Sequence, residues 1–305
     1  QMSKIMTMCD AVARFVPHGS SVVMGAALES LIPFAAGHEI IRRQVRDLTL
    51  IGPISDILFD QLIGAGCVRK VIAAWVGNVS AGLGHNYRRA CEQLIPQRLE
   101  VIHHSNFTVS LALIGGGLGA PYIPTYSLLG TDIPGTNPAF RQSVSPFGGE
   151  KILLVPSLQP DVAILHVQRS DENGNAHAWG SLGISEEAAL ASQRIIIVAE
   201  EIVPHQIIVS DPNRVLAPSF KVCAVVREPG GAHPSPVQGY YNRDHEYYHE
   251  YHRATRTVEG NAEWLGQWVA DVKDRAGYLQ KLGKERWQGL QLKAHRYAAP
   301  VDYGY

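Results

Sequence analysis

Apolar and polar positions follow two alternating patterns along the first two thirds of the chain. Short continuous or β-branched apolar runs predict buried strands at residues 20–25, 48–51, 68–76, 99–103, 152–155, 162–167, 195–198 and 220–226. Apolar residues at helical spacing predict helices at residues 7–16, where Thr7 is the expected N-cap, and at 32–43, 56–63, 85–94 and 186–192. Strands that alternate with helices indicate βαβ units. We therefore expect an α/β fold with an open, mostly parallel sheet and helices on both of its faces.

The apolar stretch at residues 107–113 has no decisive period and is either a helix or a buried run. Ser105 and Asn106 stand just before it, where a helix N-terminus presents backbone N–H groups that have no partner within the helix. The sequence GGGLG follows it, and its glycines leave the backbone free to adopt positive φ and to approach a ligand closely. We expect residues 115–117 to shape a loop beside a ligand site, with a tight packing turn as the alternative.

The character of the sequence changes at about residue 244. Charged and aromatic residues dominate from there on, and we expect helices at residues 244–256, 262–272 and 275–282. No low-complexity linker separates this part from the rest. We therefore divide the chain into an α/β domain at residues 1–243 and a C-terminal helical extension of the same domain at residues 244–305. We expect the extension to wrap the domain or a partner instead of forming a second core.

The bulk composition excludes several classes of protein. The 305 residues are 46% apolar and 18% charged with a net charge of −1, so the basic excess typical of nucleic-acid or membrane-surface binding is missing. The longest apolar stretch is broken by glycine and proline, which argues against a membrane span. The four cysteines are scattered without a CxxC pair, as in a cytoplasmic protein with reduced thiols. Because no signal peptide is recognised, we expect the natural chain to begin at Met2.

Common catalytic and cofactor motifs are missing from the sequence. No GxGxxG follows a strand, and neither GxSxG nor GxxxxGK before serine or threonine occurs. His245, His249 and His252 lie at i, i+4 and i+7, so they would share one face of a helix and could gather a metal ion. They alternate with glutamate and tyrosine and lack a fourth ligand at a clear spacing. A solvated or interface face is therefore favoured, and no metal site is expected.

Several residues at predicted strand ends could carry chemistry, and each also has a simpler interpretation. Glu172 lies in DENGN, where Asp, Asn and Gly suit a tight turn, but it could also be a nucleophile. Glu29 follows the first strand, at the edge where open α/β sheets bind ligands, or is an exposed carboxylate at a helix entry. Gly25 is the better candidate because its N–H lies at the carboxyl end of that strand, although it could simply end the strand. Asn78 is a site residue or a turn residue that holds its own backbone.

Taken in order, several stretches resemble the family I CoA-transferases, and among them the alpha subunits of the glutaconate CoA-transferase type. The residues that carry the resemblance are MSKIMTMCDAVARFV, VVMGAALESLIPFA, DLTLIGP, LIGAGCVRKVIAAWVGN, LGAPYIP, GEKILLVPSLQPDVAILHVQRSDENGNAHAWG, AEEIV and GGAHPS. The match runs from Met2 to about Leu282 at near-constant spacing. Each stretch alone is a weak signal, whereas the ordered set is specific.

The resemblance implies ping-pong transfer of CoA between carboxylic acids, with coenzyme A as a substrate and no bound cofactor. It also implies a beta subunit of similar fold, in a heterotetramer or larger assembly, with the active site between the chains. In the family the nucleophilic glutamate belongs to that beta subunit, so we expect no catalytic residue in this chain. The local sequence around Glu172 resembles that around the family's nucleophile, but we do not expect Glu172 to be catalytic. We predict that this chain binds acyl-CoA and a small, dicarboxylic acid. Ser105 and Asn106 would contact the acyl group, and Gly25 and Ala26 would form the pocket floor. The adjacent loop would contain Gly115, Gly116 and Gly117, and further candidates are Asn78 and His233.

Two positions depart from the family pattern. The family often has Gly-Gly-Phe after the first strand, whereas this chain has Gly25-Ala26-Ala27, which alters the pocket. Related steroid-ring hydrolases share GGAH but carry a catalytic glutamate at the position of Asn106, whose amide cannot act as a general base. Ser105 and Asn106 resemble instead the Ser-Gln pair of the transferase. A chain of a ring-opening hydrolase or decarboxylase, and a non-catalytic chain that binds acyl-CoA or acts as a scaffold, stay as alternatives.

Overall fold

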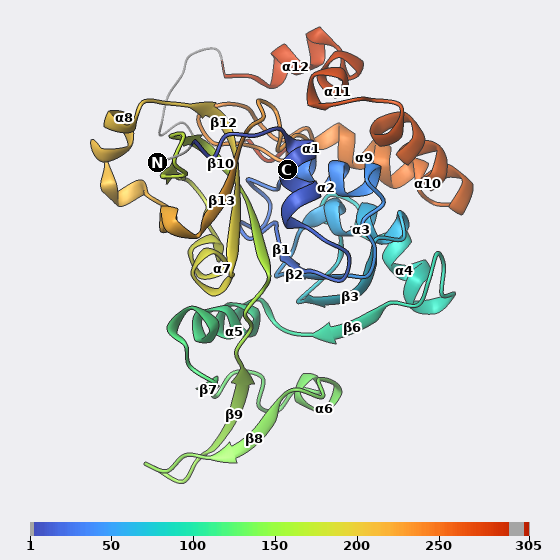
Figure 1. Cartoon of the computed structure of the whole chain (residues 1–305). Coiled ribbons are helices and arrows are strands. Elements are labelled where there is room, and N and C mark those ends of the chain that lie inside the picture. The colour runs from blue at the N-terminus through green and yellow to red at the C-terminus, as the bar shows by residue number, and fades with distance from the viewer. Residues whose placement is uncertain (1–2, 293–301, 305) are drawn as a thin grey trace.

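A largely parallel sheet runs through the centre of the computed structural model, which describes residues 3–292 and 302–304 (Figure 1). The strand order is β13-β12-β10-β1-β2-β3-β6, and β11 pairs antiparallel with β10. The bounds are β1 Ser21–Val23, β2 Leu48–Gly52, β3 Val68–Ala73, β6 Glu100–His103, β10 Val162–Ser170, β11 Ala176–His177, β12 Arg194–Ile202 and β13 Val222–Arg227. The predicted α/β fold with an open, mostly parallel sheet is confirmed.

The two faces of the sheet are buried in separate apolar layers, because successive residues of a strand point to opposite sides. Val22 pairs with Leu50 and packs in one layer, whereas Val23 pairs with Ile51 and packs in the other. This alternation continues across the sheet, and both layers are largely closed to solvent. The continuous apolar runs of the sequence therefore correspond to strands covered on both faces.

Helices cover the two faces of the sheet unequally. Residues of α1, α2, α3 and α4 pack in the first layer, and residues of α5 and α7 pack in the second. Thr7 caps α1 as predicted, because its side chain accepts a hydrogen bond of 3.1 Å from the Asp10 N–H. The bounds of these and the smaller helices are α1 Met8–Phe15, α2 Phe34–Arg42, α3 Asp56–Gly64, α4 His85–Glu92, α5 Asn106–Leu118, α6 Ile133–Thr136, α7 Ser185–Ala191, α8 His205–Val209, η1 Pro212–Arg214 and η2 Ser219–Lys221.

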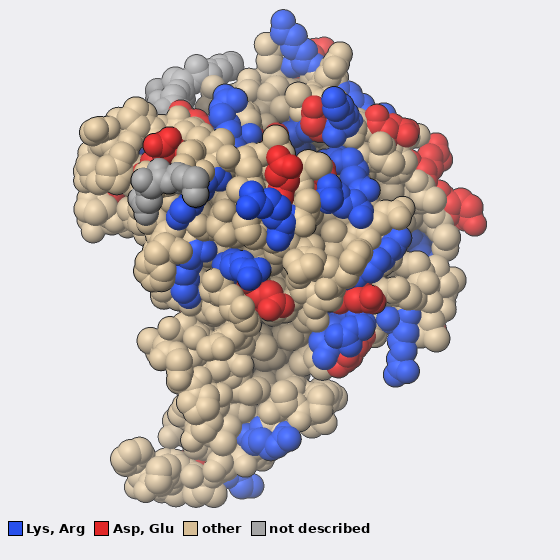
Figure 2. Space-filling view, viewed as in Figure 1, with Lys and Arg blue, Asp and Glu red and all other residues tan. Residues whose placement is uncertain are grey.

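A small antiparallel sheet projects from the main body as an arm (Figure 1). Its strand order is β7-β9-β8, with bounds β7 Tyr122–Thr125, β8 Arg141–Val144 and β9 Lys151–Pro156. The predicted strand at residues 152–155 therefore lies in this sheet and not in the parallel one. Burial alternates along β9, since one of its faces packs on the end of α5 and the other is more exposed. Few charged side chains appear on the visible face of the arm (Figure 2).

The predicted loop at residues 115–117 is wrong, because all three glycines lie inside helix α5. A Cβ atom at Gly115 would clash with the Ser157 hydroxyl, and one at Gly116 with the Leu158 carbonyl. Gly119 ends the helix with φ +70°, the left-handed conformation that glycine adopts without strain. The glycines therefore allow a helix to approach a neighbouring backbone closely, which is the packing role weighed as the alternative, in a helix instead of a turn.

The C-terminal helices pack on the first layer of the core. The bounds are α9 His245–Ala254, α10 Val258–Leu265, the π-helical turn η3 Gly266–Ala270, α11 Arg275–Leu282 and α12 Lys284–Leu290. Tyr247, Tyr248 and Tyr251 of α9 are fully buried beside α2 and α3 residues. The extension therefore shares the core of the α/β part. In the part of the chain that is described, no helix is long and apolar enough to cross a membrane.

Candidate active site

The carboxyl ends of the parallel strands form one edge of the sheet, where α/β proteins bind their ligands. The chain leaves β1 toward β2 on one side and returns to β10 on the other, so the order of connections reverses beside β1. The segments that follow β1, β2, β3 and β6 at this edge are residues 24–33, 53–55, 74–84 and 104–105. We call this edge, from β1 to β6, the candidate active face.

The segment after β1 has a strained and tightly supported backbone. Gly25 has φ +68°, and its Cα lies against the Ser55 side chain so closely that a Cβ atom would clash with it. The Ser55 hydroxyl in turn donates a hydrogen bond of 2.9 Å to the Met24 carbonyl. Leu28 and Leu31 also have positive φ, +64° and +54°, which is uncommon for large side chains. Such strain persists only where the surrounding structure fixes the backbone, and it is concentrated at functional sites.

Two other loops hold the segment after β1 in place. The Ser235 hydroxyl donates to the Glu29 carbonyl at 2.9 Å and accepts from the Ile32 N–H at 3.3 Å. The Ile184 N–H donates to the Ala26 carbonyl at 2.8 Å. Gly25 and Ala26 are consequently buried within this chain. Their predicted place at a pocket floor stays a prediction.

A buried arginine connects the segments that follow β1, β2 and β3. Arg243 donates to Glu29 Oε2 at 3.1 Å, to Asp56 Oδ2 at 3.0 Å and to Ser80 Oγ at 2.7 Å. Its guanidinium also stacks on the ring of Tyr248 at 3.8 Å. The side chains of Arg243 and Asp56 are fully buried, whereas that of Glu29 is 26% exposed. Burial raises the pKa of Asp56 to about 7, against the opposing effect of the Arg243 charge.

Asn78 is a buried residue whose hydrogen bonds stabilise the same region. Its amide donates to the Tyr248 carbonyl at 2.8 Å, and its side-chain oxygen accepts from the Ser80 N–H at 3.0 Å. Asn78 is 1% exposed, so it ties the short hairpin of β4 Gly77–Asn78 and β5 Gly82–Leu83 to helix α9. The turn interpretation describes this geometry well.

Ser105 and Asn106 differ in what their side chains do. The Ser105 hydroxyl caps α5 by accepting from the Thr108 N–H at 3.1 Å, and Thr108 Oγ1 accepts from the Ser105 N–H at 2.9 Å. Asn106 is the first residue of α5 and is exposed. Within residues 3–292 and 302–304, its amide makes no hydrogen bond. The capping serine therefore fixes the backbone, and the neighbouring Asn106 amide is exposed.

The two histidines before Ser105 differ in exposure. His103 is exposed, and its carbonyl accepts a hydrogen bond of 2.9 Å from Asn137. His104 is buried, with its Nδ1 at 3.1 Å from Thr108 Oγ1. Burial lowers the pKa of His104 to about 4, so its imidazole is neutral at physiological pH.

The predicted site residues form two groups, Gly25 and Ala26 after β1 and Ser105 and Asn106 after β6, and the strand order sets the distance between them. Because β2 and β3 lie between β1 and β6, these two strands are about 14 Å apart, three strand spacings, and Gly25 and Ser105 follow their carboxyl ends. Both groups thus lie on the candidate active face without contact between them. A ligand that touches both must be extended along this edge.

His233 and Glu172, two further residues weighed from the sequence, lie in contrasting environments. His233 is fully buried, with its ring nitrogens at 2.8 Å from the Tyr278 hydroxyl and 2.9 Å from Asp244 Oδ2. It therefore joins the core to the C-terminal helices, and a ligand contact would require one of these hydrogen bonds to break. Glu172 is exposed on a turn in which Asp171 Oδ1 accepts from the Asn173 and Asn175 N–H groups at 2.9 Å.

The three histidines of α9 do not converge on one point. His245 and His249 approach each other with 3.0 Å between their Nε2 atoms, whereas His252 packs on His85 with ring centroids 4.4 Å apart. Over the described ranges, 3–292 and 302–304, no group of three or more His, Cys, Asp or Glu side chains is arranged to hold a metal ion.

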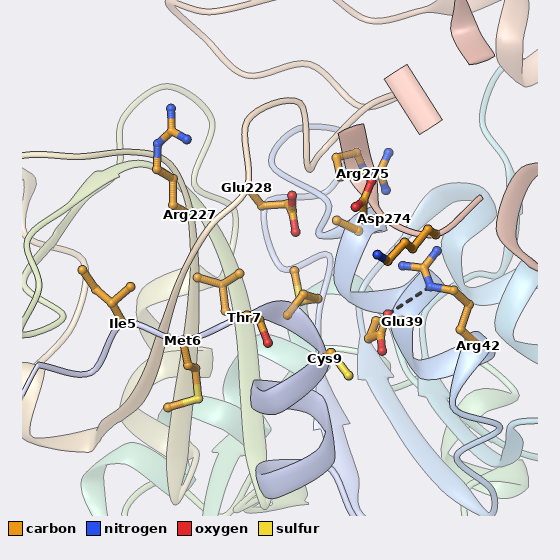
Figure 3. Close-up of a pocket in the computed structure, with 14 residues that line it drawn as sticks. Ile5, Met6, Thr7, Cys9, Glu39, Arg42, Arg227, Glu228, Asp274 and Arg275 are labelled. Atoms are coloured by element: carbon orange, nitrogen blue, oxygen red, sulfur yellow. Dashed lines mark hydrogen bonds and ion pairs between the residues drawn. The ribbon is translucent and has the colours of Figure 1, made fainter. Parts of the chain in front are cut away.

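A cavity of about 640 Å³ lies away from the candidate active face, beside the end of β13 (Figure 3). Glu228 points into it, and Arg42 at its edge pairs with Glu39 at 3.0 Å. Burial raises the pKa of the Glu228 carboxyl. Asn106 is not among the residues that line this cavity.

The residues of this face that sequence reasoning missed are Asp56, Ser80 and Arg243. In the sequence, Asp56 is only the first residue of a predicted helix, and Arg243 only the last residue before the C-terminal helices. A single signal is available, because arginine placed before a run of tyrosines suits a buried guanidinium stacked on an aromatic ring. Its carboxylate partners come from segments 187 and 214 positions away, so the sequence alone does not reveal the cluster.

Comparisons with known proteins all point to the same family, and the relatives match nearly the whole chain. The model of the coenzyme A transferase family matches residues 5–228. The A-type subunit of 3-oxoadipate CoA-transferase from Pseudomonas knackmussii is 37% identical over 283 residues, which cover 93% of this chain and 99% of the relative. The A-type subunit of glutaconate CoA-transferase from Acidaminococcus fermentans is 32% identical over 95% of both chains.

Two solved structures share the fold over similar lengths. The crystal structure of the same glutaconate CoA-transferase superposes with a TM-score of 0.88 at 31% identity, covering 95% of this chain and 96% of the other. A variant of the decarboxylase AibA/AibB superposes with a TM-score of 0.71 at 26% identity, covering 92% of this chain and 99% of the other.

Proposed function

Because this chain belongs to the coenzyme A transferase family, as an A-type subunit, we propose that it works with a beta-type subunit to move CoA from an acyl-CoA to a dicarboxylic acid. The two CoA-transferase relatives described above are named for 3-oxoadipate and glutaconate, which are both dicarboxylic acids. Coenzyme A enters as a substrate of this reaction. The partner would cover the candidate active face.

The exposed amide of Asn106 carries the proposal. It stands at the start of a thirteen-residue helix whose first N–H groups also face this edge, next to a serine already committed to capping. An amide donates to a carbonyl or carboxylate oxygen but takes up no proton, so it suits binding and polarisation and not base catalysis. A transferase whose nucleophile comes from another chain needs this kind of residue.

The proposed reaction proceeds in two half-reactions. A glutamate carboxylate of the partner attacks the thioester carbonyl, and the C–S bond breaks to give a mixed anhydride and the CoA thiolate. The thiolate then attacks the glutamyl carbonyl of the anhydride, which releases the first acid and leaves an enzyme–CoA thioester. The second acid reverses both steps. In this chain, Asn106 would hold the acyl oxygen while negative charge develops on it.

The two candidate glutamates of this chain support a nucleophile in the partner. Glu29 is held by Arg243 through an ion pair of 3.1 Å, which fixes the direction of its carboxylate. Glu172 lies on a tight turn at the end of β10, more than one strand away from Asn106. Neither places a free carboxylate beside the Asn106 amide.

Covalent labelling of the purified native complex tests the proposal. Incubation with glutaryl-CoA followed by borohydride would reduce an enzyme–CoA thioester to an alcohol, and mass spectrometry would locate the modified glutamate. Modification in a second chain supports the proposal. Modification at Glu172 would make this chain the catalytic one and overturn the division of roles. Consumption of acyl-CoA with no modified glutamate would favour the decarboxylase or hydrolase alternative.

A further inference from the structure

Arg243, the last residue before the C-terminal helices, lies between helix α9 and the candidate active face. Its guanidinium contacts Glu29, Asp56 and Ser80, which follow three successive strands of the sheet. Its fourth contact is the face of Tyr248 in helix α9. One side chain from outside the sheet thus holds the segments after β1 and β3 together with the first residue of α3, which directly follows the segment after β2.

The cluster is fixed by more than the arginine. Asp56 Oδ1 accepts from the Val79 N–H at 3.1 Å, so this carboxylate binds both the arginine and the loop after β3. His245 Nδ1 lies at 3.3 Å from the Ser80 hydroxyl, which adds a second link from α9 to the same loop. Because Arg243 and Asp56 are fully buried, removal of Arg243 would leave the Asp56 carboxyl group buried without its ion-pair partner.

We propose that Arg243 is a positioning residue of the candidate active face, which holds the loops at residues 24–33 and 74–80 in the geometry that turnover requires. This inference rests on the proposed transferase function. Arg243 reaches no exposed surface, so it acts on the substrate only through these loops. The C-terminal helices, which contact Arg243 through Tyr248, would then help to position the candidate active face and not only wrap the domain.

The strain in the first loop explains why such a residue is needed. Leu28 has φ +64°, and Glu29, the next residue, is held through its side chain by Arg243 and through its carbonyl by Ser235. Without Arg243, one of these two restraints is lost and the loop can relax toward ordinary backbone angles. A shift of about 1 Å in a group that touches substrate can lower turnover by about 10²-fold.

The test compares Arg243→Lys with Arg253→Ala in the assembled complex. Lysine keeps the positive charge but lacks the planar fork that reaches three oxygens at once. Arg253 lies further along α9 and forms an exposed pair with Glu246, so its loss is a matched control. The measurements are kcat and KM for the acyl-CoA, the midpoint of thermal unfolding, and deuterium exchange of peptides that cover residues 24–33 and 74–80.

We expect Arg243→Lys to raise exchange in both loops at least about fivefold and to lower kcat by about tenfold to a hundredfold. KM should change less than threefold, and Arg253→Ala should match the natural chain in every measurement. Unchanged exchange, or looser loops with unchanged kcat, would overturn the inference. If both loops loosen but the natural complex transfers no CoA to any dicarboxylate, the proposed function fails while the structural contact is retained.

A second variant keeps the inference testable if Arg243→Lys does not fold. Ser80→Ala removes one half-buried hydroxyl and leaves the ion pairs intact. We expect it to raise exchange at residues 74–80 but not at residues 24–33, with a decrease in kcat of about threefold. Equal loosening of both loops, or none in either, would contradict the separate contacts that the structure assigns to Arg243.

Discussion

The Ser55 hydroxyl donates a hydrogen bond to the Met24 carbonyl and occupies the space where a side chain at Gly25 would have to go. This relationship fixes the first residues after β1 and makes glycine necessary there for two reasons. One is its φ of +68°, and the other is the clash that any Cβ atom would make.

The two reasons are separated by a pair of substitutions. Gly25→Ala should lower the free energy of unfolding through the left-handed backbone, about 1–2 kcal/mol, and through the clash, about 1–3 kcal/mol more. Gly19→Ala should show the backbone cost alone, because Gly19 has φ +79° with open space around its Cα. Urea denaturation of both variants measures the difference. Equal losses would mean that Ser55 moves away without cost.

Asn106→Ala should lower kcat of the complex by about 10²-fold, since it removes a donor from the developing charge of the acyl group. Assembly should be unchanged, because the exposed Asn106 side chain makes no hydrogen bond within the described residues. Size-exclusion chromatography and initial rates measure the two effects. Ser110→Ala, one turn further along α5, is the matched control and should retain full activity. Normal turnover in Asn106→Ala would remove this residue from the site.

The titration of Asp56 should make the free energy of unfolding depend on pH. Its pKa is about 7 in the folded chain and about 4 in the unfolded chain, so the folded state binds a proton more tightly. The resulting stabilisation is fully present below about pH 4 and is lost as pH rises to about 7. Arg243 and Glu29 are the charges that face this carboxyl group from the neighbouring segments.

Asp56→Asn removes this titration. The free energy of unfolding of the natural chain, minus that of the variant, should therefore fall as pH rises from about 4.5 through 7 and become level above about pH 8. Urea denaturation across this range provides the measurement. A difference that rises with pH would show that the Arg243 charge outweighs burial and keeps Asp56 ionised.

Gly116→Ala should destabilise the chain even though alanine favours helices. The added methyl group would collide with the Leu158 carbonyl, which belongs to the backbone and cannot rotate away. We expect a loss of about 1–3 kcal/mol in urea denaturation. Gly289→Ala in the exposed part of α12, where a Cβ atom meets nothing within 4 Å, should instead gain about 0.5–1 kcal/mol. A gain at both positions would show that α5 shifts freely.

Regular elements are predictable because their signals are local. The Thr7 cap and the apolar runs of β1, β2 and β10 depend on residues a few positions apart, and the structure confirms them. The resemblance carried by the ordered stretches also indicates the correct family. Periodicity, however, does not show which sheet a strand joins, so the pattern of β9 fits the parallel sheet although this strand pairs with β7 and β8.

The candidate active face is predictable only in part, because its contacts are long-range. Ser105 and Asn106 mark the start of one helix in the sequence, and that start is where the structure places them. The prediction for the glycines at 115–117 is wrong because the clash that requires them comes from Ser157, Leu158 and Leu190, which lie about forty to seventy positions further along. The Arg243 cluster brings together residues from four separate segments, a juxtaposition that only the folded chain reveals.

The central position of β1 has a consequence for synthesis on the ribosome. Its three residues pair with β2 early, but their other neighbour is β10, and Ser21 bonds Asp161 from 140 positions away. At about 5–20 residues per second, that partner emerges roughly 7–30 s later. During this interval the middle strand of the finished sheet is the open edge of a nascent half-sheet, which exposes it to wrong pairing. The three-residue length of β1 limits this exposure, since a short edge is a poor template for another chain.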